Sequence, residues 1–456
     1  MIHIKNILSI LPSGYAQQIR NCDILIEGNL ILEVGRNLSP SKSKFDIRTI
    51  DASDMVVVPG MVNTHHHFYQ TFTRNIPAVQ NAELFDWLIH LYDIWKHMDA
   101  DTIWWSTALA GAELLKTGCT TSSDHHYLYP EGIGADIMAL QFDAASRVGI
   151  RFCPTRGSMS RSKKDGGLPP DTTVQSEDTI LADSERVIRE FHDSHFHAMR
   201  KIALAPCSPF SVSEELMRQT AALAREYGVR MHTHLAETKD ENDYCLQIYK
   251  RRPLQLMEDC NFIGEDVWFA HGIFFDDSEI DRLADTGTHI AHCPSSNMRL
   301  GSGICRVREM LDKNVNVSIS IDGSASNDSS DMLGEVRQAL LLQRVAKGAS
   351  ALNVKEAWKM AGENGACLLG FEKIGRIEAG WAADLAIFNV MDIPYVGALS
   401  DPAAALIFAG YNHKTAYTIV NGRVVVEEGK LVGIPEEELV AKASEAVNNL
   451  YRRAEL

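Results

Sequence analysis

Eight short apolar runs alternate with longer segments of helical spacing, and this alternation is the feature that most constrains the fold. In chain order the runs are VVVPGMVNT, GCTTSSDHH, GIRFCPTR, KIALAPCS, GVRMHTHLA, DVWFAHG, THIAHCP and NVSISIDG. Strand-like runs separated by helices indicate parallel strands joined by helical crossovers. Eight such units predict a TIM-type (β/α)8 barrel, whose functional groups gather at the carboxyl ends of its strands.

The two ends of the chain have a different texture, with short β-like runs broken by turns. Such runs cover Ile2–Val57, Ile374–Val390 and Thr415–Val432, and the pair Asn421-Gly422 is typical of a hairpin turn. We therefore expect a small β-sandwich domain built from both chain ends. The expected boundaries are residues 1–56 and 373–435 for this domain, 57–372 for the barrel and 436–456 for a C-terminal helix.

Charge and cysteine content argue against several kinds of partner and site. The net charge is −16 without any basic block, which argues against nucleic acid or an anionic membrane as a partner. The nine cysteines are scattered without a Cys-x-x-Cys pair, which argues against a disulfide framework and a thiolate zinc site. Because there is no cleavable leader and no apolar stretch of ~18 residues, we expect a cytoplasmic protein. We also expect a homo-oligomer.

The first apolar run ends at a cluster of three histidines. His65 and His67 lie two residues apart, so on an extended backbone their side chains point to the same side, while His66 points away. Two ligands of one metal ion must converge in this way. A His-x-His pair also occurs by chance on protein surfaces, so a metal site needs further ligands from other strands.

Other runs end in groups of the same kind. The fifth run leads into His232, His234 and Glu237, the sixth ends at His271, and the eighth ends at Asp322. The carboxyl ends of strands one, five, six and eight would face one another across a barrel mouth. Three histidines and a carboxylate, completed by water, form a catalytic zinc site, although such ligands also suit iron or manganese.

The remaining histidines have simpler interpretations. His195 and His197 precede the fourth run, at its wrong end, and we expect them to be solvated. His292 ends the seventh run and is interpreted as a packing residue or a support for a ligand. Residues that end the second run are expected to support the ligands from behind: Asp124, His125 and His126.

Five ordered motifs resemble the amidohydrolase superfamily, in particular its aminohydrolases that deaminate purines, S-adenosylhomocysteine and triazines. The motifs are PGMVNTHHH, MHTHLAE, FAHG, HCPSSNMRLGSG and SISIDGSASND. The tail Ile374–Val390 also resembles the closing β-sandwich segment of that family, so the resemblance spans roughly residues 1–435. It implies a hydrolase that replaces a ring amino group by oxygen and releases ammonia.

The resemblance also implies roles for individual residues. His65, His67, His234 and Asp322 match the metal ligands of the family, Glu237 its proton-shuttling glutamate, and His271 its sixth-strand histidine. In the implied reaction a metal-bound hydroxide attacks the amino-bearing carbon and Asp322 accepts a proton. Glu237 protonates the ring nitrogen and later the leaving ammonia, and His271 hydrogen bonds the developing oxygen. The structural alternative for Glu237 is a first-turn helix carboxylate.

A single metal is expected. Family members with two metals use a modified lysine at the end of strand four. Here Lys201 begins the fourth run, and Ala205, Pro206 and Cys207 end it. We therefore predict one divalent ion per chain, Zn²⁺.

The resemblance extends to a substrate. The segments FDWLIHLYDIWKHMD and DHHYLYP resemble bacterial 8-oxoguanine deaminases, which implies 8-oxoguanine as substrate and urate and ammonia as products. Gln70 occupies the place where guanine deaminases carry a purine-reading glutamine, and an amide offers both a donor and an acceptor. The Arg-Phe pair of guanine deaminases is absent, since Cys207-Ser208-Pro209-Phe210 stands in its place.

Three further assignments leave alternatives open. Trp87 and Trp95 are candidates to stack on the ring, although tryptophans at helical spacing more often belong to the core. Cys207 lines the pocket or is a small buried residue. The polar stretch Ser158–Glu177 is expected to be a long loop that could cover the site.

Two other functions compete with this one. The first keeps the fold and changes the ring to a hydroxylated triazine, guanine, isocytosine or S-adenosylhomocysteine. The second is a metal-free structural relative without catalysis. A scaffold does not require all six polar residues at the strand ends, which argues against the second.

Overall fold

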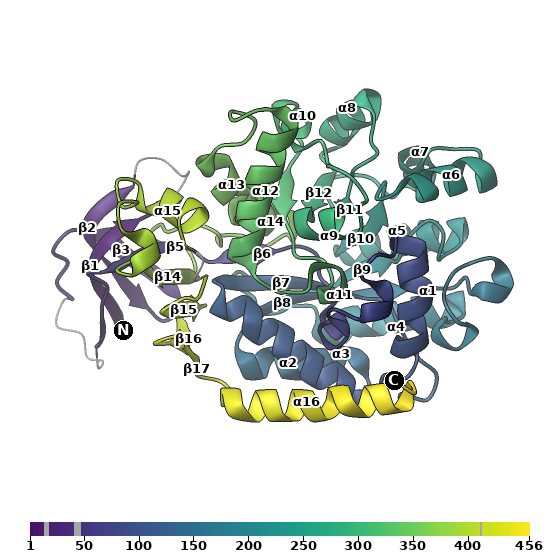
Figure 1. The fold of residues 1–456 in the computed structure, drawn as a ribbon, viewed down its shortest axis with the longest axis horizontal. Coiled ribbons are helices and arrows are strands. Elements are labelled where there is room, and N and C mark those ends of the chain that lie inside the picture. Colours follow the sequence, from purple (N-terminus) through teal and green to yellow (C-terminus); the bar gives the residue numbers. More distant parts are fainter. Residues whose placement is uncertain (13–17, 41–46, 411–412) are drawn as a thin grey trace.

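The computed structural model describes residues 1–12, 18–40, 47–410 and 413–456, and one of its two sheets is an eight-stranded parallel barrel (Figure 1). Each strand derives from one of the eight apolar runs. Backbone N–H of Asp322 donates to the His65 carbonyl at 3.0 Å, which connects the last strand to the first. The predicted barrel is confirmed, with strands β6 (Met61–Asn63), β7 (Cys119–His126), β8 (Arg151–Ser158), β9 (Ala203–Pro206), β10 (Arg230–Leu235), β11 (Val267–His271), β12 (His289–His292) and β13 (Val317–Ile319).

The second sheet contains nine strands from both chain ends. Its centre is β5, which pairs parallel with β1 and antiparallel with β14, so the two ends are hydrogen bonded together. The turn at Asn421-Gly422 has φ values of 49° and 77°, as a tight hairpin turn requires. The expected β domain from both ends is confirmed, with strands β1 (Ile2–Ile10), β2 (Ile19–Glu27), β3 (Leu30–Gly35), β4 (Arg48–Asp51), β5 (Met55–Pro59), β14 (Leu385–Asn389), β15 (Tyr417–Val420), β16 (Arg423–Glu427) and β17 (Lys430–Leu431).

The first apolar run contains two strands rather than one. The expected domain boundary after residue 56 falls inside β5, and the chain changes sheets at Gly60, between β5 and β6. A Cβ atom at Gly60 would lie 2.2 Å from Thr120 Oγ1, so only glycine allows this crossing. Residues on both sides of Gly60 are buried, and for this reason the apolar pattern does not mark the change of sheet.

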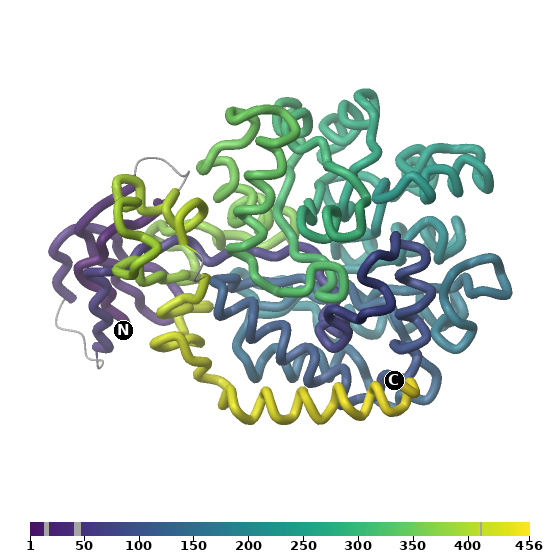
Figure 2. The backbone as a smooth tube through the Cα atoms, in the orientation of Figure 1, coloured from purple at the N-terminus to yellow at the C-terminus, as the bar shows by residue number. Residues whose placement is uncertain are grey.

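Helices surround the barrel, and the last one runs alongside it (Figure 2). Helix α16 packs on α2, and Tyr451 Oη donates to the carbonyl of Phe72 at 2.8 Å. Phe72 belongs to the 3₁₀ helix η2 (Phe68–Thr73), which directly follows the histidine cluster. The helices are α1 (Leu84–Trp95), α2 (Ala100–Lys116), α3 (Ile137–Val148), α4 (Glu177–Phe191), α5 (Glu214–Tyr227), α6 (Lys239–Ile248), α7 (Pro253–Asp259), α8 (Asp277–Thr286), α9 (Pro294–Arg299), α10 (Val307–Asp312), α11 (Ser324–Asn327), α12 (Met332–Lys347), α13 (Val354–Ala361), α14 (Glu363–Leu368), α15 (Pro402–Phe408) and α16 (Glu436–Arg453).

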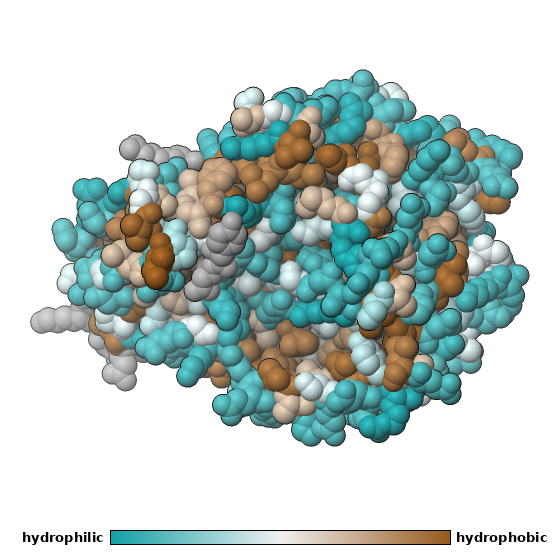
Figure 3. Space-filling view, viewed as in Figure 1, coloured by the Kyte–Doolittle hydropathy of each residue, from teal (hydrophilic) through white to brown (hydrophobic). Residues whose placement is uncertain are grey.

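Hydrophilic side chains cover most of the face seen in Figure 3, between smaller hydrophobic patches. Among the helices of the described ranges, none combines the length and apolarity needed to cross a bilayer. The polar stretch between β8 and α4 contains two short 3₁₀ helices, Lys163–Asp165 and Asp171–Thr173.

A buried ion pair connects the two sheets. Arg151 in β8 donates from Nη2 to both carboxylate oxygens of Asp384, at 2.8 and 3.1 Å, and Asp384 directly precedes β14. The exposed fractions of the two side chains are 0% and 1%. Asp384 also accepts the backbone N–H of Asn421 at 2.6 Å. The carboxylate therefore holds the hairpin of the small domain and a barrel strand in one arrangement.

We expect Asp384→Ala to destabilise the protein strongly, because it leaves the Arg151 guanidinium buried without a counter-ion. Removing one partner of a buried pair costs about 3–5 kcal/mol. Urea unfolding followed by circular dichroism measures the loss. The control is Glu445→Ala. Glu445 forms an exposed ion pair with Lys442, and loss of that pair should leave the unfolding midpoint nearly unchanged. Equal midpoints for both variants would contradict this account of the interface.

Candidate metal centre and active site

The backbone after β6 directs two histidines inward and one outward. His66 Nε2 lies 3.0 Å from Ser330 Oγ, away from its two neighbours. His65 and His67 instead approach the same carboxylate oxygen, Asp322 Oδ1, with Nε2 at 3.2 and 3.3 Å. Asp322 follows β13, so the first and last strands of the barrel supply this contact.

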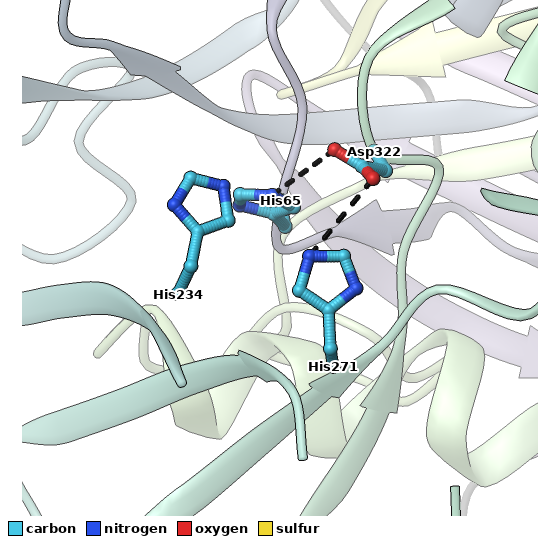
Figure 4. A group of neighbouring side chains, drawn as sticks. All are labelled: His65, His234, His271 and Asp322. Atoms are coloured by element: carbon cyan, nitrogen blue, oxygen red, sulfur yellow. Dashed lines mark ion pairs between the residues drawn. The ribbon is translucent and has the colours of Figure 1, made fainter. Parts of the chain in front are cut away.

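Two more strands complete the cluster. His234 belongs to β10 and His271 is the last residue of β11. Possible ligand atoms of His65, His234, His271 and Asp322 all lie within 4.8 Å of one another (Figure 4). His67 belongs to the same group, because its Nε2 lies 3.2 Å from His234 Nε2. The side chains that the sequence assigns to the carboxyl ends of these strands therefore converge.

Backbone carbonyls determine which nitrogen of each ring carries hydrogen. His67 Nδ1 donates to the carbonyl of His125 at 2.8 Å, and His234 Nδ1 donates to the carbonyl of Cys207 at 2.7 Å. In a neutral imidazole the other nitrogen is then an acceptor with a lone pair. The Nε2 atoms of His67 and His234 therefore direct lone pairs toward the same space.

A relay through a third histidine fixes His65 in the same way. His232 Nδ1 donates to the carbonyl of Trp268 at 3.0 Å, so its Nε2 is an acceptor. That acceptor lies 2.8 Å from His65 Nδ1, which therefore donates to it. His65 Nε2 has no hydrogen-bond partner in the described part of the chain and faces Asp322. His232 thus supports a ligand rather than acting as one.

This arrangement fits a divalent cation. Burial lowers the pKa of His65 and of His234 well below the usual value, so both rings are neutral. Lone pairs and a carboxylate that face one another repel unless a cation lies between them. Imidazole nitrogens and one carboxylate oxygen are the ligand set of a catalytic zinc site. His65, His67, His234 and Asp322 are the residues that would hold the ion.

Glu237 and His271 lie at the edge of this cluster. His271 Nδ1 contacts Asn297 Oδ1 at 2.9 Å, and its Nε2 lies 3.5 Å from Glu237 Oε2 and 4.0 Å from Asp322 Oδ2. Burial and the negative charge of Asp322 raise the pKa of Glu237 well above the usual value. The raised pKa favours the protonated form of Glu237, which lies next to the imidazole of His271.

A second buried glutamate, which the sequence reasoning missed, positions Glu237. The two carboxylate oxygens of Glu241 accept the backbone N–H groups of Ala236 and Glu237, each at 2.9 Å. Ala236 has a φ of +54°, so the chain reverses sharply after β10, and Glu241 holds this turn. Its spacing of four residues from Glu237, in the first turn of α6, was the available sequence signal.

The expected supporting residues also have partners. Asp124 accepts the backbone N–H of Phe68 at 2.7 Å, directly after His67, and burial raises its pKa to about 6. His125 stacks on His234 with ring centroids 4.8 Å apart. By contrast, His195 is solvated and pairs with Asp193. His292 is buried, and neither of its ring nitrogens has a partner among the described residues.

A pocket opens beside the cluster of histidines and Asp322. Gln70, Cys207 and Trp87 line it, as does Tyr127, which the sequence reasoning missed although it follows His126 directly. Trp95 does not reach it, because its ring is fully buried and its indole N–H donates to Thr73 Oγ1 at 3.0 Å. The loop between β8 and α4 contributes none of the lining residues, which are His67, Gln70, Leu84, Trp87, Leu88, Tyr92, Tyr127, Cys207, Phe210, His234, Glu237, His271, Leu300, Asp322 and Ser326.

Comparison with known proteins assigns the chain to a family. The model of the amidohydrolase family matches residues 56–425. The chain belongs to this family. It is 44% identical to the 8-oxoguanine deaminase of Pseudomonas aeruginosa, over 93% of this chain and 95% of that protein. It is 35% identical to an isoxanthopterin deaminase from an unknown prokaryotic organism, over 98% of this chain and 97% of that one.

A solved structure has the same fold. The atrazine chlorohydrolase of Arthrobacter aurescens, crystallised in complex with zinc, superposes with a TM-score of 0.93 at 31% identity, over 98% of this chain and 100% of that one. The family and its deaminase relatives, rather than this neighbour, show that this amidohydrolase is an enzyme that hydrolyses carbon–nitrogen bonds by deamination. The competing hypothesis of a structural relative without catalysis is wrong.

The fourth barrel strand of the amidohydrolase carries no lysine at its carboxyl end. β9 ends at Pro206, while Lys201 precedes the strand and its ammonium contacts the carbonyl of Gly370. A modified lysine that bridges two metals would have to lie at the other end of the strand. The prediction of one metal per chain rests on this arrangement.

Two neighbouring histidines offer a matched test of the metal site. We expect His67→Gln to retain less than about a tenth of a zinc equivalent after dialysis, and His66→Gln to retain roughly one equivalent. The reason is that, of these two side chains, that of His67 faces Asp322 and that of His66 points away. Elemental analysis of the purified variants measures this. Equal zinc content in the two variants would mean that the ligand set is wrongly assigned.

Proposed function

We propose that this amidohydrolase converts 8-oxoguanine and water into urate and ammonia. The observation that carries the proposal is the position of Gln70 beside the reacting centre. A Cβ atom on Gly323, the residue after Asp322, would lie 1.7 Å from Gln70 Oε1, so the amide covers that glycine closely. An amide there can pair with the lactam edge of a purine. The 44% identity to an 8-oxoguanine deaminase supports the same ring.

One divalent ion, Zn²⁺, would be held by His65, His67, His234 and Asp322. When bound, such an ion lowers the pKa of a water molecule toward ~7, so that the water can act as a nucleophile at neutral pH. The buried rings of His232 and His125, together with the carbonyls that fix the ligands, would hold the donor set in place.

The protein groups move the protons of the reaction. Asp322 accepts a proton from the attacking water while the oxygen of that water bonds to the amino-bearing carbon. Glu237 gives its proton to the ring nitrogen next to the amino-bearing carbon, which makes that carbon electrophilic. It then regains a proton and passes it to the leaving amino group. His271, between Glu237 and Asp322, exchanges protons with both and hydrogen bonds the new oxygen. The carbon–nitrogen bond breaks, and ammonia leaves.

The rest of the pocket would bind the ring. Gln70, Cys207 and Tyr127 border the inner end, close to the histidines: Tyr127 lies 5.1 Å from the His67 ring between centroids, and Cys207 Sγ lies 3.9 Å from His234 Nδ1. Trp87 lines one wall of the pocket together with Leu84, Leu88 and Tyr92, which also belong to α1. Trp95 supports that wall from behind and is not assigned to the substrate.

A second candidate substrate is isoxanthopterin. Its pterin ring presents the same amino-lactam edge as 8-oxoguanine and carries a further carbonyl on its second ring. The 35% identity to an isoxanthopterin deaminase over 98% of the chain supports it, and the shared amino-lactam edge is the group that Gln70 would recognise.

We also propose that the protein assembles as a homo-oligomer. Three apolar side chains of one segment are largely exposed, Met391 at 61%, Ile393 at 87% and Val396 at 85%. A second copy would remove this apolar surface from water.

Ammonia release from a panel of rings tests the substrate assignment. The panel contains 8-oxoguanine, isoxanthopterin, guanine, isocytosine, hydroxylated triazines and S-adenosylhomocysteine. We expect the highest kcat/KM for 8-oxoguanine, because Gln70 would pair with its lactam edge and the chain is 44% identical to an 8-oxoguanine deaminase. A higher kcat/KM for a triazine or for S-adenosylhomocysteine would overturn the substrate assignment and leave the deaminase chemistry intact.

A further inference from the structure

We propose that the indole N–H of Trp87 hydrogen bonds the carbonyl on the second ring of the substrate, which is the C8 carbonyl of 8-oxoguanine. Trp87 would then be the residue that selects oxidised purines over guanine. The inference rests on the proposed function and deepens it, since it names the group that distinguishes the two rings.

The starting observation is a buried donor without a partner. Trp87 lines the pocket and is 3% exposed, and its Nε1 makes no hydrogen bond to any described residue. Within the described lining of the pocket, Gln70 Oε1 is the other buried side-chain atom in this condition. Buried polar groups are nearly always paired, so an unpaired one in a binding pocket points to a ligand.

Trp95 on the same helix shows that the missing partner is specific to Trp87. Both tryptophans lie in α1 with ring centroids 5.6 Å apart, and both are buried. Trp95 lies outside the pocket and donates to Thr73. The fold thus provides an acceptor for the indole N–H of Trp95 in the core. The indole N–H of Trp87, which lines the pocket, has no acceptor among the described residues.

Trp87 lines the pocket from a different element than the reacting groups, which lie at the ends of barrel strands. The inner end of the pocket contains the ligands and Glu237, which must lie at the amino-bearing carbon. Leu84, Trp87 and Leu88 line the pocket from α1, which supplies none of the histidines or acidic groups of the cluster. A bicyclic substrate with its amino carbon at Asp322 therefore directs its second ring toward α1.

The chemistry of that end differs between the candidate rings. In 8-oxoguanine the second ring ends in a carbonyl, which accepts an N–H. In guanine the same carbon carries hydrogen and accepts nothing, so the indole N–H would stay buried and unpaired. A site built to hydrogen bond a substrate group discriminates strongly against an analogue that lacks it.

The test compares two substitutions and two substrates. For Trp87→Phe we expect the ratio of kcat/KM for 8-oxoguanine to that for guanine to fall about tenfold or more, because phenylalanine keeps an aromatic wall but has no N–H. Trp95→Phe removes an indole outside the pocket and should leave the ratio unchanged. A parallel loss for both substrates, or no loss, would overturn the inference. Absence of 8-oxoguanine turnover in the wild type would instead overturn the proposed function.

A measurement on the unaltered protein keeps the test open if Trp87→Phe does not fold. The probes are urate and xanthine, the products from 8-oxoguanine and guanine. With ¹⁵N-labelled tryptophan, we expect urate to shift one indole N–H resonance downfield and xanthine at saturation not to shift it. Equal responses to the two products, or no response to urate, would show that the indole does not contact the second-ring carbonyl.

Discussion

The convergence of imidazole lone pairs and one carboxylate in a buried space is the constraint on which the structure of the site depends. The ring hydrogens of His65, His67 and His234 all point outward to other acceptors, so no N–H of these three rings offsets the facing lone pairs and carboxylate. Each outward acceptor lies on or beside a barrel strand. The barrel therefore determines the tautomers, the tautomers determine the direction of the lone pairs, and the lone pairs require a cation.

Backbone strain accompanies this convergence. Ala236, His271 and Asp322 have φ values of +54°, +72° and +66°, in a region that side-chain-bearing residues rarely adopt. Such a conformation costs about 1–3 kcal/mol per residue and persists only where the surrounding structure enforces it. Here the strain lies at the ends of three barrel strands, where it turns His271 and Asp322 inward and begins the turn that carries Glu237. The two hydrogen bonds from Glu241 hold that turn.

Much of this could be predicted from the sequence, because strand ends and their polar residues are local features. The runs that end in His234, His271 and Asp322 became β10, β11 and β13, and their side chains lie together. Features that depend on packing between distant segments could not be predicted. Trp95 is fully buried and donates to Thr73, whereas Trp87 on the same helix lines the pocket. The change of sheet at Gly60 was hidden because both of its flanks are apolar and buried.

The central claim is that the cluster binds a metal while Glu237 carries the proton that the reaction needs. Glu237→Gln tests it most directly, since glutamine preserves size and cannot transfer that proton. The measurement is zinc content and single-turnover rate on the same preparation, with Asp240→Asn, an exposed position on α6, as control. The account predicts that Glu237→Gln keeps its zinc while its rate falls by a factor of about 100 or more. For Asp240→Asn it predicts no change in either quantity. A rate near that of the wild type with zinc retained would contradict it.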